Sequence, residues 1–456
     1  MGTPTQAAFL CLLAYAVASC GSVDLLPSSL LAVGLGLLII FPRRPDPNAA
    51  NIARLWLVCS VSLAFLAVAA LAQSLRIDDN PFEHPAWNVV RESIRPISGA
   101  ISLDPEQTRA SIVTLSPALG FLVTIRLFSI RADAMRLLRQ LCWLGAAVAA
   151  FGILQHIFFP SFLALGRKSF YLDSVTAFFV NRNSAGTFFG VGTLLALGMT
   201  LRHLRAINPS KLPERLFAQN SHQSQDYRRF AFFSCLTLLQ GVALLLTQSR
   251  GAAGATFFAI VIFVFVMARQ RLWEGTWTVL PQELSPLARL CVLVLAAAGA
   301  VALLSERSAY RMESGSDGAR LCVFGSTLEA TRNAWPLGSG LGTFQDVFPA
   351  YRDADCAGIA GVWEAAHNFY LEGALSLGLV FVVVVPVILF ALTHAFLEGL
   401  RTRRRYRFVP SLGIAVLVLV GLHSLVDFSM QVPGVALYVA AILGCCATIS
   451  LERARA

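Results

Sequence analysis

The sequence predicts an all-α polytopic membrane protein with about twelve transmembrane helices. Apolar residues make up 56% of the 456 residues and charged residues only 14%, whereas soluble domains carry roughly 25% charge. The mean hydropathy is +0.66, and the apolar residues gather in continuous stretches, many of them about twenty residues long. This composition excludes a soluble enzyme and a disordered chain, and it predicts a single helical membrane domain over residues 1–456.

The apolar stretches set the order of the expected elements. They lie near residues 7–20, 25–41, 52–73, 111–126, 137–159, 184–201, 230–247, 252–268, 288–304, 367–393, 410–427 and 430–450. The fourth stretch is expected to begin as a helix at Pro105, because Asp104 and Gln107 provide an N-cap and a capping partner. Residues 305–366 separate the ninth and tenth stretches, and a connection of this length in a helical bundle is more often functional than idle.

The distribution of charge predicts the topology. When the N-terminus is placed in the cytoplasm, 23 of the 36 Lys and Arg residues fall on the cytoplasmic side. On the same assignment, 18 of the 26 Asp and Glu residues fall on the outer side, in agreement with the positive-inside rule. Both termini are therefore expected in the cytoplasm and residues 305–366 in the periplasm. The net charge of +10 then reports topology, and we expect no nucleic-acid partner.

Two short outer segments carry polar residues that hydropathy does not explain. In residues 179–186, Asn183 either caps the sixth helix or supports a site, and Arg182 either reaches the headgroups or binds an anion. Residues 247–251 read Thr-Gln-Ser-Arg-Gly, and the turn between two helices needs only the glycine. Arg250 costs free energy there unless it faces water or a partner, so it is either a headgroup contact or a ligand-binding residue.

The long outer loop contains further arginines and a glycine-rich run. Arg311 precedes a helix expected over residues 318–334, Arg320 lies in its first turn, and Pro336 ends it. The run Pro-Leu-Gly-Ser-Gly-Leu-Gly-Thr-Phe at 336–344 lacks the Lys-Ser/Thr of a phosphate-binding loop, so it indicates tight backbone turns beside a site. Cys322 and Cys356 share this loop, either as a disulfide or as two unrelated thiols.

Ionisable residues recur where the tenth and eleventh stretches meet the outer side. His367 is expected at a helix N-terminus, either as a general base or as a helix cap, and Asn368 and Glu372 share one helix face. His423 and Asp427 are also four residues apart and are expected on one face. They either serve a site or form a structural hydrogen bond between helices.

The outer face as a whole suits a strongly anionic ligand. The residues that it offers are Arg182, Arg250, Arg320, His367 and Asp427. Arginine binds phosphate oxygens through two parallel hydrogen bonds. Because the sequence has no clustered carboxylates and no His/Cys ligand spacing, we expect no metal and no other cofactor.

Five of these stretches, in this order, resemble the O-antigen ligase and O-antigen polymerase family of bacterial membrane glycosyltransferases. The matching stretches are residues 179–186, 249–251, Arg320 with 335–344, 367–372 and 423–428. The resemblance implies a GT-C-like membrane fold with a large periplasmic loop before the tenth helix. It also implies glycosyl transfer at the periplasmic face of the inner membrane, from a glycan on undecaprenyl pyrophosphate.

The same resemblance assigns roles to single residues. Arg250 and Arg320 would hold the pyrophosphate, with Arg311 as a competitor for the second role and Arg182 as a further cation. His367 would assist acceptor activation and Asp427 would support the site. Because arginines can stabilise the pyrophosphate leaving group, the transfer is expected to be metal-independent, and one-step displacement would invert the sugar configuration.

Other functions stay open at this point. A ligase would use lipid A–core as acceptor and a polymerase would use another lipid-linked glycan, and the motifs do not separate the two. A transporter or flippase is the second alternative, but it would place charged residues near the bilayer midplane rather than at the outer end.

Overall fold

The computed structural model describes residues 4–40, 50–94, 97–164, 166–204, 206–208, 211–212, 222–273, 316–352, 362–403 and 406–452. Within these ranges, eight helices are long and apolar enough to cross a membrane, and three more apolar helices are shorter. They correspond to eleven of the twelve predicted stretches, while the ninth, 288–304, lies outside the described residues. The prediction of an all-α polytopic membrane fold is confirmed.

The first half of the chain forms a helical series with one small hairpin. Its elements are α1 (Pro4–Ala18), η1 (Cys20–Ser22), α2 (Leu25–Ile40), α3 (Ala50–Gln73), α4 (Ala86–Ser93), α5 (Pro105–Ser111), η2 (Ile112–Leu115), α6 (Ser116–Leu127), α7 (Arg131–Phe158), β1 (Phe162–Leu163), β2 (Gly166–Arg167) and α8 (Arg182–Leu204). The predicted start of the fourth stretch is confirmed, because the Asp104 carboxylate accepts hydrogen bonds from Glu106 N and Gln107 N, each at 2.9 Å.

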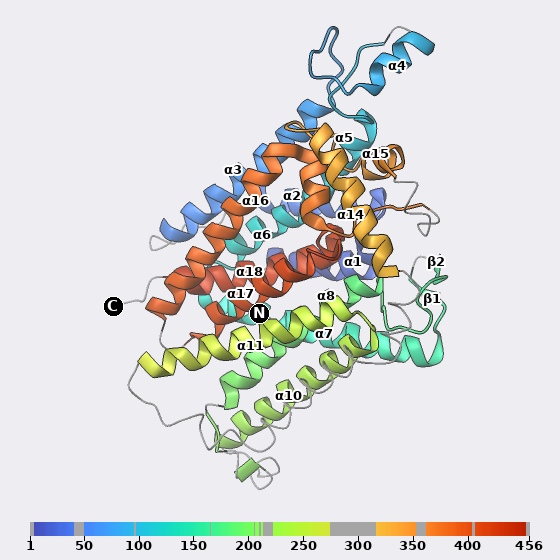
Figure 1. Ribbon diagram of the computed structural model, residues 1–456. Helices are drawn as coiled ribbons and strands as arrows, with labels where there is room; N and C mark the ends of the chain where they lie inside the picture. Colours follow the sequence, from blue (N-terminus) through green and yellow to red (C-terminus); the bar gives the residue numbers. More distant parts are fainter. Residues whose placement is uncertain are drawn as a thin grey trace.

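The second half contains the helices that carry most of the predicted site. Its elements are α10 (His222–Leu246), α11 (Arg250–Trp273), α14 (Ser316–Asn333), α15 (Phe344–Tyr351), α16 (Phe369–Thr402), α17 (Phe408–His423), η4 (Ser429–Gln431) and α18 (Pro433–Leu451). The helix expected near 318–334 is α14. Figure 1 shows α14, α15 and the β1–β2 hairpin at the end of the bundle where α8, α11 and α16 begin, and we call it the site end.

Helices α8 and α18 form the centre of the bundle. In the most apolar window of each, 94% of the residues are buried, compared with 22% in α3 at the periphery. Small residues allow this packing: a Cβ on Gly190 would lie 2.2 Å from the Thr256 hydroxyl of α11. Helix α8 consequently packs against α10, α11, α17 and α18.

Helix α16 is not continuous, although hydropathy predicts one unbroken stretch. Gly378 has φ +56° and ψ −135°, and a Cβ there would lie 2.0 Å from Pro336 O. Residues 336–343, which we call the glycine segment, occupy the break. Ser339 N donates to Leu375 O (2.8 Å), Gly340 N donates to Ser376 O (3.1 Å) and Leu379 N donates to Pro336 O (2.8 Å).

Helix α3 completes this junction. The Gln73 side-chain amide donates to Leu337 O (2.6 Å) and to Ser376 O (2.8 Å). The carbonyls freed by the break in α16 are thus paired inside the protein, as a membrane environment requires. The glycine segment is therefore a backbone joint that orients the first part of α16, residues 369–377.

Two details of the sequence prediction need correction. Helix α17 ends at His423, so Asp427 lies in the following turn and not on one helix face with His423. Asn368 is the N-cap of α16, with a side chain that accepts from Tyr370 N (3.0 Å) and Leu371 N (3.1 Å), so it does not share a helix face with Glu372. In both cases a polar residue ends or starts the helix instead of extending it.

Candidate functional site

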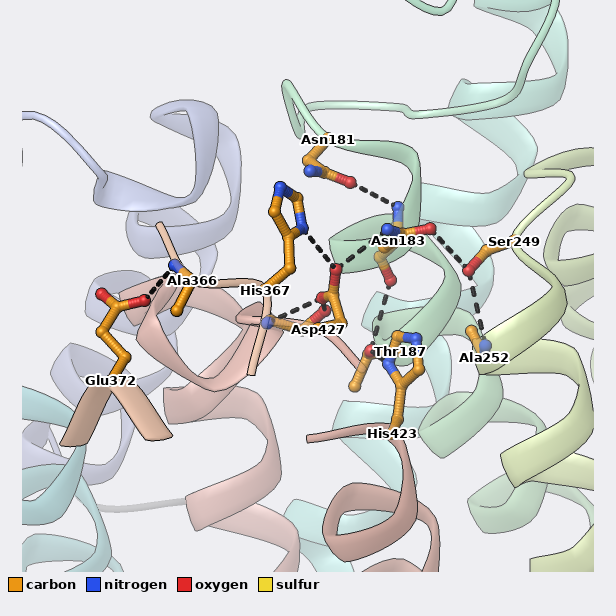
Figure 2. Close-up of polar contacts among 11 residues, drawn as sticks. Asn181, Asn183, Thr187, Ser249, Ala252, Ala366, His367, Glu372, His423 and Asp427 are labelled. Atoms are coloured by element: carbon orange, nitrogen blue, oxygen red, sulfur yellow. Dashed lines mark hydrogen bonds and ion pairs between the residues drawn. The ribbon is translucent and has the colours of Figure 1, made fainter. Parts of the chain in front are cut away.

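A connected set of polar side chains lies at the site end of the bundle, and we call it the polar network. Its members are Asn183, Thr187, Ser249, His367, His423, Asp427 and Ser429. Figure 2 shows the labelled members coming from α8, from the residue before α11, from the segment before α16, and from the end of α17 and the segment after it. Distant parts of the chain therefore meet at the place where the sequence predicts a site.

Asn183 is the hub of the polar network. Its backbone N donates to Asn181 Oδ1 (2.7 Å), which fixes the first turn of α8. Its amide Nδ2 donates to Asp427 Oδ1 (2.9 Å), and its Oδ1 accepts from Ser249 Oγ (2.8 Å). Asn183 thus links Asp427 to Ser249, the residue before Arg250, whereas Asn181 caps α8.

Asp427 is fully buried and surrounded by donors. Ser429 N donates to Oδ2 at 2.8 Å, and the Ser429 hydroxyl donates to the same oxygen. Burial raises the pKa of Asp427, but His367 beside it, the charge of His423 and these hydrogen bonds lower it by more. The net pKa lies below the ordinary value, so Asp427 is a carboxylate at neutral pH.

His367 faces this carboxylate. Its Nδ1 lies 3.9 Å from Asp427 Oδ1, an ion-pair distance that is too long for a hydrogen bond, and Nδ1 is buried without a hydrogen-bond partner in the described structure. The backbone of His367 has φ +53°, a region that non-glycine residues rarely adopt and that is typical of functional sites. Because Asn368 caps α16, His367 is not the helix cap.

His423 is held more tightly than His367. Its Nδ1 lies 2.7 Å from Thr187 Oγ1, and its side chain is 3% exposed. A Cβ on Gly251 would lie 3.0 Å from the His423 ring, so glycine allows the start of α11 to approach it. His423 therefore joins α17, α8 and α11, and the structural interpretation of this residue is the better supported one.

Two of the predicted arginines lie close to the polar network. Arg250 is the first residue of α11 and stands between Ser249, which bonds Asn183, and Gly251, which packs on His423. Arg320, in the first part of α14, is close enough for its charge to act on His423. Arg250 therefore lies next to the polar network and the Arg320 charge acts on it, while the binding of pyrophosphate by these residues stays a prediction.

The remaining predicted residues have different outcomes. The Arg182 guanidinium lies 5.1 Å from the Tyr171 ring centroid, which holds this cation at the start of α8. Glu372 accepts from Ala366 N at 2.7 Å, so it supports the segment that carries His367. Arg311 lies outside the described residues.

The expected cysteine pair is described only in part. Cys322 is disulfide-bonded, and Cys356 lies outside the described residues. The described ranges contain no group of three or more His, Cys, Asp or Glu side chains placed to hold a metal ion.

Sequence reasoning missed the connecting hydroxyls. Thr187, Ser249 and Ser429 link the charged residues, yet each reads in the sequence as an ordinary helix or turn residue. Ser249 lies within the motif that singled out Arg250, and its position next to that arginine was the available signal.

The family comparison agrees with this geometry. Residues 235–385 match the family model described as O-antigen ligase. The match covers about one third of the chain, from α10 into α16, and includes Arg250, Arg320 and His367. No curated protein matches the chain. The predicted resemblance to the O-antigen ligase and polymerase family is confirmed, and it supports a general role in the transfer of lipid-linked glycans.

Proposed function

We propose that this chain, with an O-antigen ligase segment at residues 235–385, transfers a glycan from undecaprenyl pyrophosphate to lipid A–core. The reaction would occur at the periplasmic face of the bacterial inner membrane. One observation carries the proposal: a histidine faces a buried carboxylate in the same polar network that holds the residue before Arg250.

The geometry supports separate roles for the base, His367, and for the arginine cations. Asp427 faces Nδ1 of His367, which leaves Nε2 as the nitrogen that takes the proton from the acceptor hydroxyl. The hydroxyl oxygen forms a bond to the anomeric carbon while the bond between that carbon and the phosphate oxygen breaks. The proton resides on His367, and undecaprenyl pyrophosphate leaves with the electron pair. Attack opposite the leaving group inverts the anomeric configuration.

Arg250 and Arg320 would stabilise the departing pyrophosphate, with Arg182 or Arg311 as a further cation. Guanidinium groups supply fixed positive charge and paired donors where negative charge develops. This arrangement supports a transfer that needs neither a metal nor another cofactor.

Two alternatives make different demands on the same site. A polymerase would use a second lipid-linked glycan as acceptor, with identical chemistry at His367 and Arg250. A transporter would use a broken helix to line a path, and α16 is broken at Gly378. The glycine segment, however, forms hydrogen bonds with the freed backbone groups of that break. This pairing favours a structural role for the break over a substrate pathway.

The function is tested by reconstitution of the full chain in liposomes with undecaprenyl-pyrophosphate-linked glycan and lipid A–core. Transfer should yield a glycan on lipid A–core, and deletion in cells should cause lipid-linked polymer to accumulate. Single-repeat chains in the deletion strain would favour the polymerase. Glycan movement across the bilayer without any new glycosidic bond would contradict both.

The proposed topology has its own test. In a variant without the exposed Cys11 and Cys235, a membrane-impermeant thiol reagent should label Val362→Cys in intact spheroplasts but not Thr402→Cys. Both positions are exposed, whereas Arg403 next to the second one is buried and would be a poor reporter. Labelling of Thr402→Cys alone would place His367 on the cytoplasmic side and refute the assignment.

A further inference from the structure

Trp363 lies beside the proposed base and has no role in the mechanism described so far. Its ring meets the His367 ring edge-to-face, with centroids 5.4 Å apart and an interplanar angle of 81°. The ring of Phe428 also meets the His367 ring, with centroids 4.9 Å apart and an interplanar angle of 71°. His367 therefore contacts two aromatic rings, one from the segment before α16 and one from the segment after α17.

The second contact of Trp363 is with a separate apolar cluster. This cluster is formed mainly by Val323 and Ala330 of α14 and by Phe344 and Phe348 of α15. Trp363 packs against it and remains only partly buried. The indole thus contacts both the apolar cluster of α14 and α15 and the His367 ring, and part of it stays accessible.

The polar atom of this indole is free to bind a ligand. Within the described residues, no acceptor receives a hydrogen bond from Trp363 Nε1, and the atom is not buried. Trp87 differs, because its Nε1 donates to Ser102 O at 3.0 Å. A tryptophan that served packing alone would need no accessible N–H at this place.

We infer that Trp363 is the acceptor-sugar platform of the site, an inference that rests on the proposed function. The acceptor hydroxyl must reach Nε2 of His367, so the sugar that carries it lies against the groups flanking that ring. A pyranose has an apolar C–H face and a rim of hydroxyls. The indole face covers the C–H face, and Nε1–H donates to a rim hydroxyl. The platform would thereby position a sugar hydroxyl at His367.

The kinetic test separates acceptor from donor in the full-length protein. With lipid A–core and undecaprenyl-pyrophosphate-linked glycan varied in turn, Trp363→Ala should raise the acceptor KM by about tenfold. The donor KM should stay within about twofold. Trp363→Phe keeps a packing ring and loses the N–H, so its acceptor KM should fall in between. Val362→Ala, at a neighbour that is 74% exposed, should match the wild type.

A binding measurement keeps this inference distinct from the function on which it rests. Calorimetric titration of the detergent-solubilised protein with core oligosaccharide, without donor, should show binding that Trp363→Ala weakens by about tenfold. Trp363-dependent binding without any transfer would remove the proposed function and leave the sugar platform intact. Transfer with an unchanged acceptor KM and unchanged binding in Trp363→Ala and Trp363→Phe would overturn the platform alone. An equal rise of both KM values would assign Trp363 a purely structural role and overturn it too.

Discussion

Two polar regions lie buried at the same end of the bundle, and they satisfy their polar groups in opposite ways. In the glycine segment, backbone groups pair with the backbone of α16, and the Gln73 amide donates to Leu337 O and Ser376 O. In the polar network, side chains from four segments meet one another, and His367 Nδ1 stays buried without a hydrogen bond in the described structure. The glycine segment fixes the course of the backbone, whereas the polar network leaves the imidazole of His367 available beside the Asp427 carboxylate.

The difference teaches how to interpret the two kinds of motif. Glycines beside an anionic site invite a phosphate-binding interpretation, yet these glycines serve close approach between backbones. Gly340 has φ +110°, and a Cβ there would lie 2.3 Å from Ser102 Oγ. The proposed chemistry therefore depends on the charged residues, whereas the glycines allow the close backbone packing that positions α16.

The largest effect should come from the polar network. His367→Asn should reduce the transfer rate by about 10²–10⁴-fold, the range lost when a general base is removed, while insertion and yield stay normal. The measurement is initial-rate transfer in liposomes. His156→Asn is the matched control, because His156 also has a buried, unpaired Nδ1 in the described structure but lies in the last turn of α7. Full activity in His367→Asn would exclude His367 as the base.

The next effect concerns the arginine that the polar network positions. Arg250→Ala should lose about one to two orders of magnitude in rate, since a charge-assisted hydrogen bond is worth about 1.5–3 kcal/mol. Arg250→Lys should recover only part of the activity, because an ammonium keeps the charge but not the paired donors. The exposed Arg332→Lys serves as the control. Wild-type kinetics in Arg250→Lys would reduce Arg250 to a headgroup contact.

The glycine segment should respond in stability rather than in chemistry. Gly340→Ala should destabilise the protein by about 1–3 kcal/mol through overpacking, read as a lower melting temperature in detergent. Gly325→Ala in α14 is the control, because a Cβ there meets nothing within 4 Å. The rate per correctly folded molecule should change little in both variants. A large rate loss at unchanged stability in Gly340→Ala would mean that the glycine segment contacts substrate.

The smallest effect is an expected lack of change. Excess EDTA should leave the transfer rate of the purified protein within about twofold, because the proposed cations are guanidinium groups. Rates are compared before and after chelation, and then with added magnesium or manganese. Loss of activity that either metal restores would show that the arginines alone do not neutralise the pyrophosphate.

The sequence predicts the bundle well because hydropathy acts on long windows. It also predicts Asn183, His367 and Asp427 as site residues, since polar residues at the ends of apolar stretches are rare enough to stand out. The pairing of these residues could not be predicted, because it depends on hydroxyls such as Ser249 whose commonest partner is a nearby backbone carbonyl. The break in α16 is equally invisible, since residues around Gly378 remain apolar on both sides.

The break in α16 also bears on how the chain matures during synthesis. Gln73 and Ser376 are 303 positions apart, and Asn183 and Asp427 are 244 apart, so neither bond exists until nearly the whole chain has left the ribosome. The contacts that orient residues 369–377 need Gln73, the glycine segment and α16 together. A chain whose insertion stalls after α11 would hold Arg250 but no proton acceptor. If the proposed function holds, incomplete insertion yields a product that lacks the base needed for transfer.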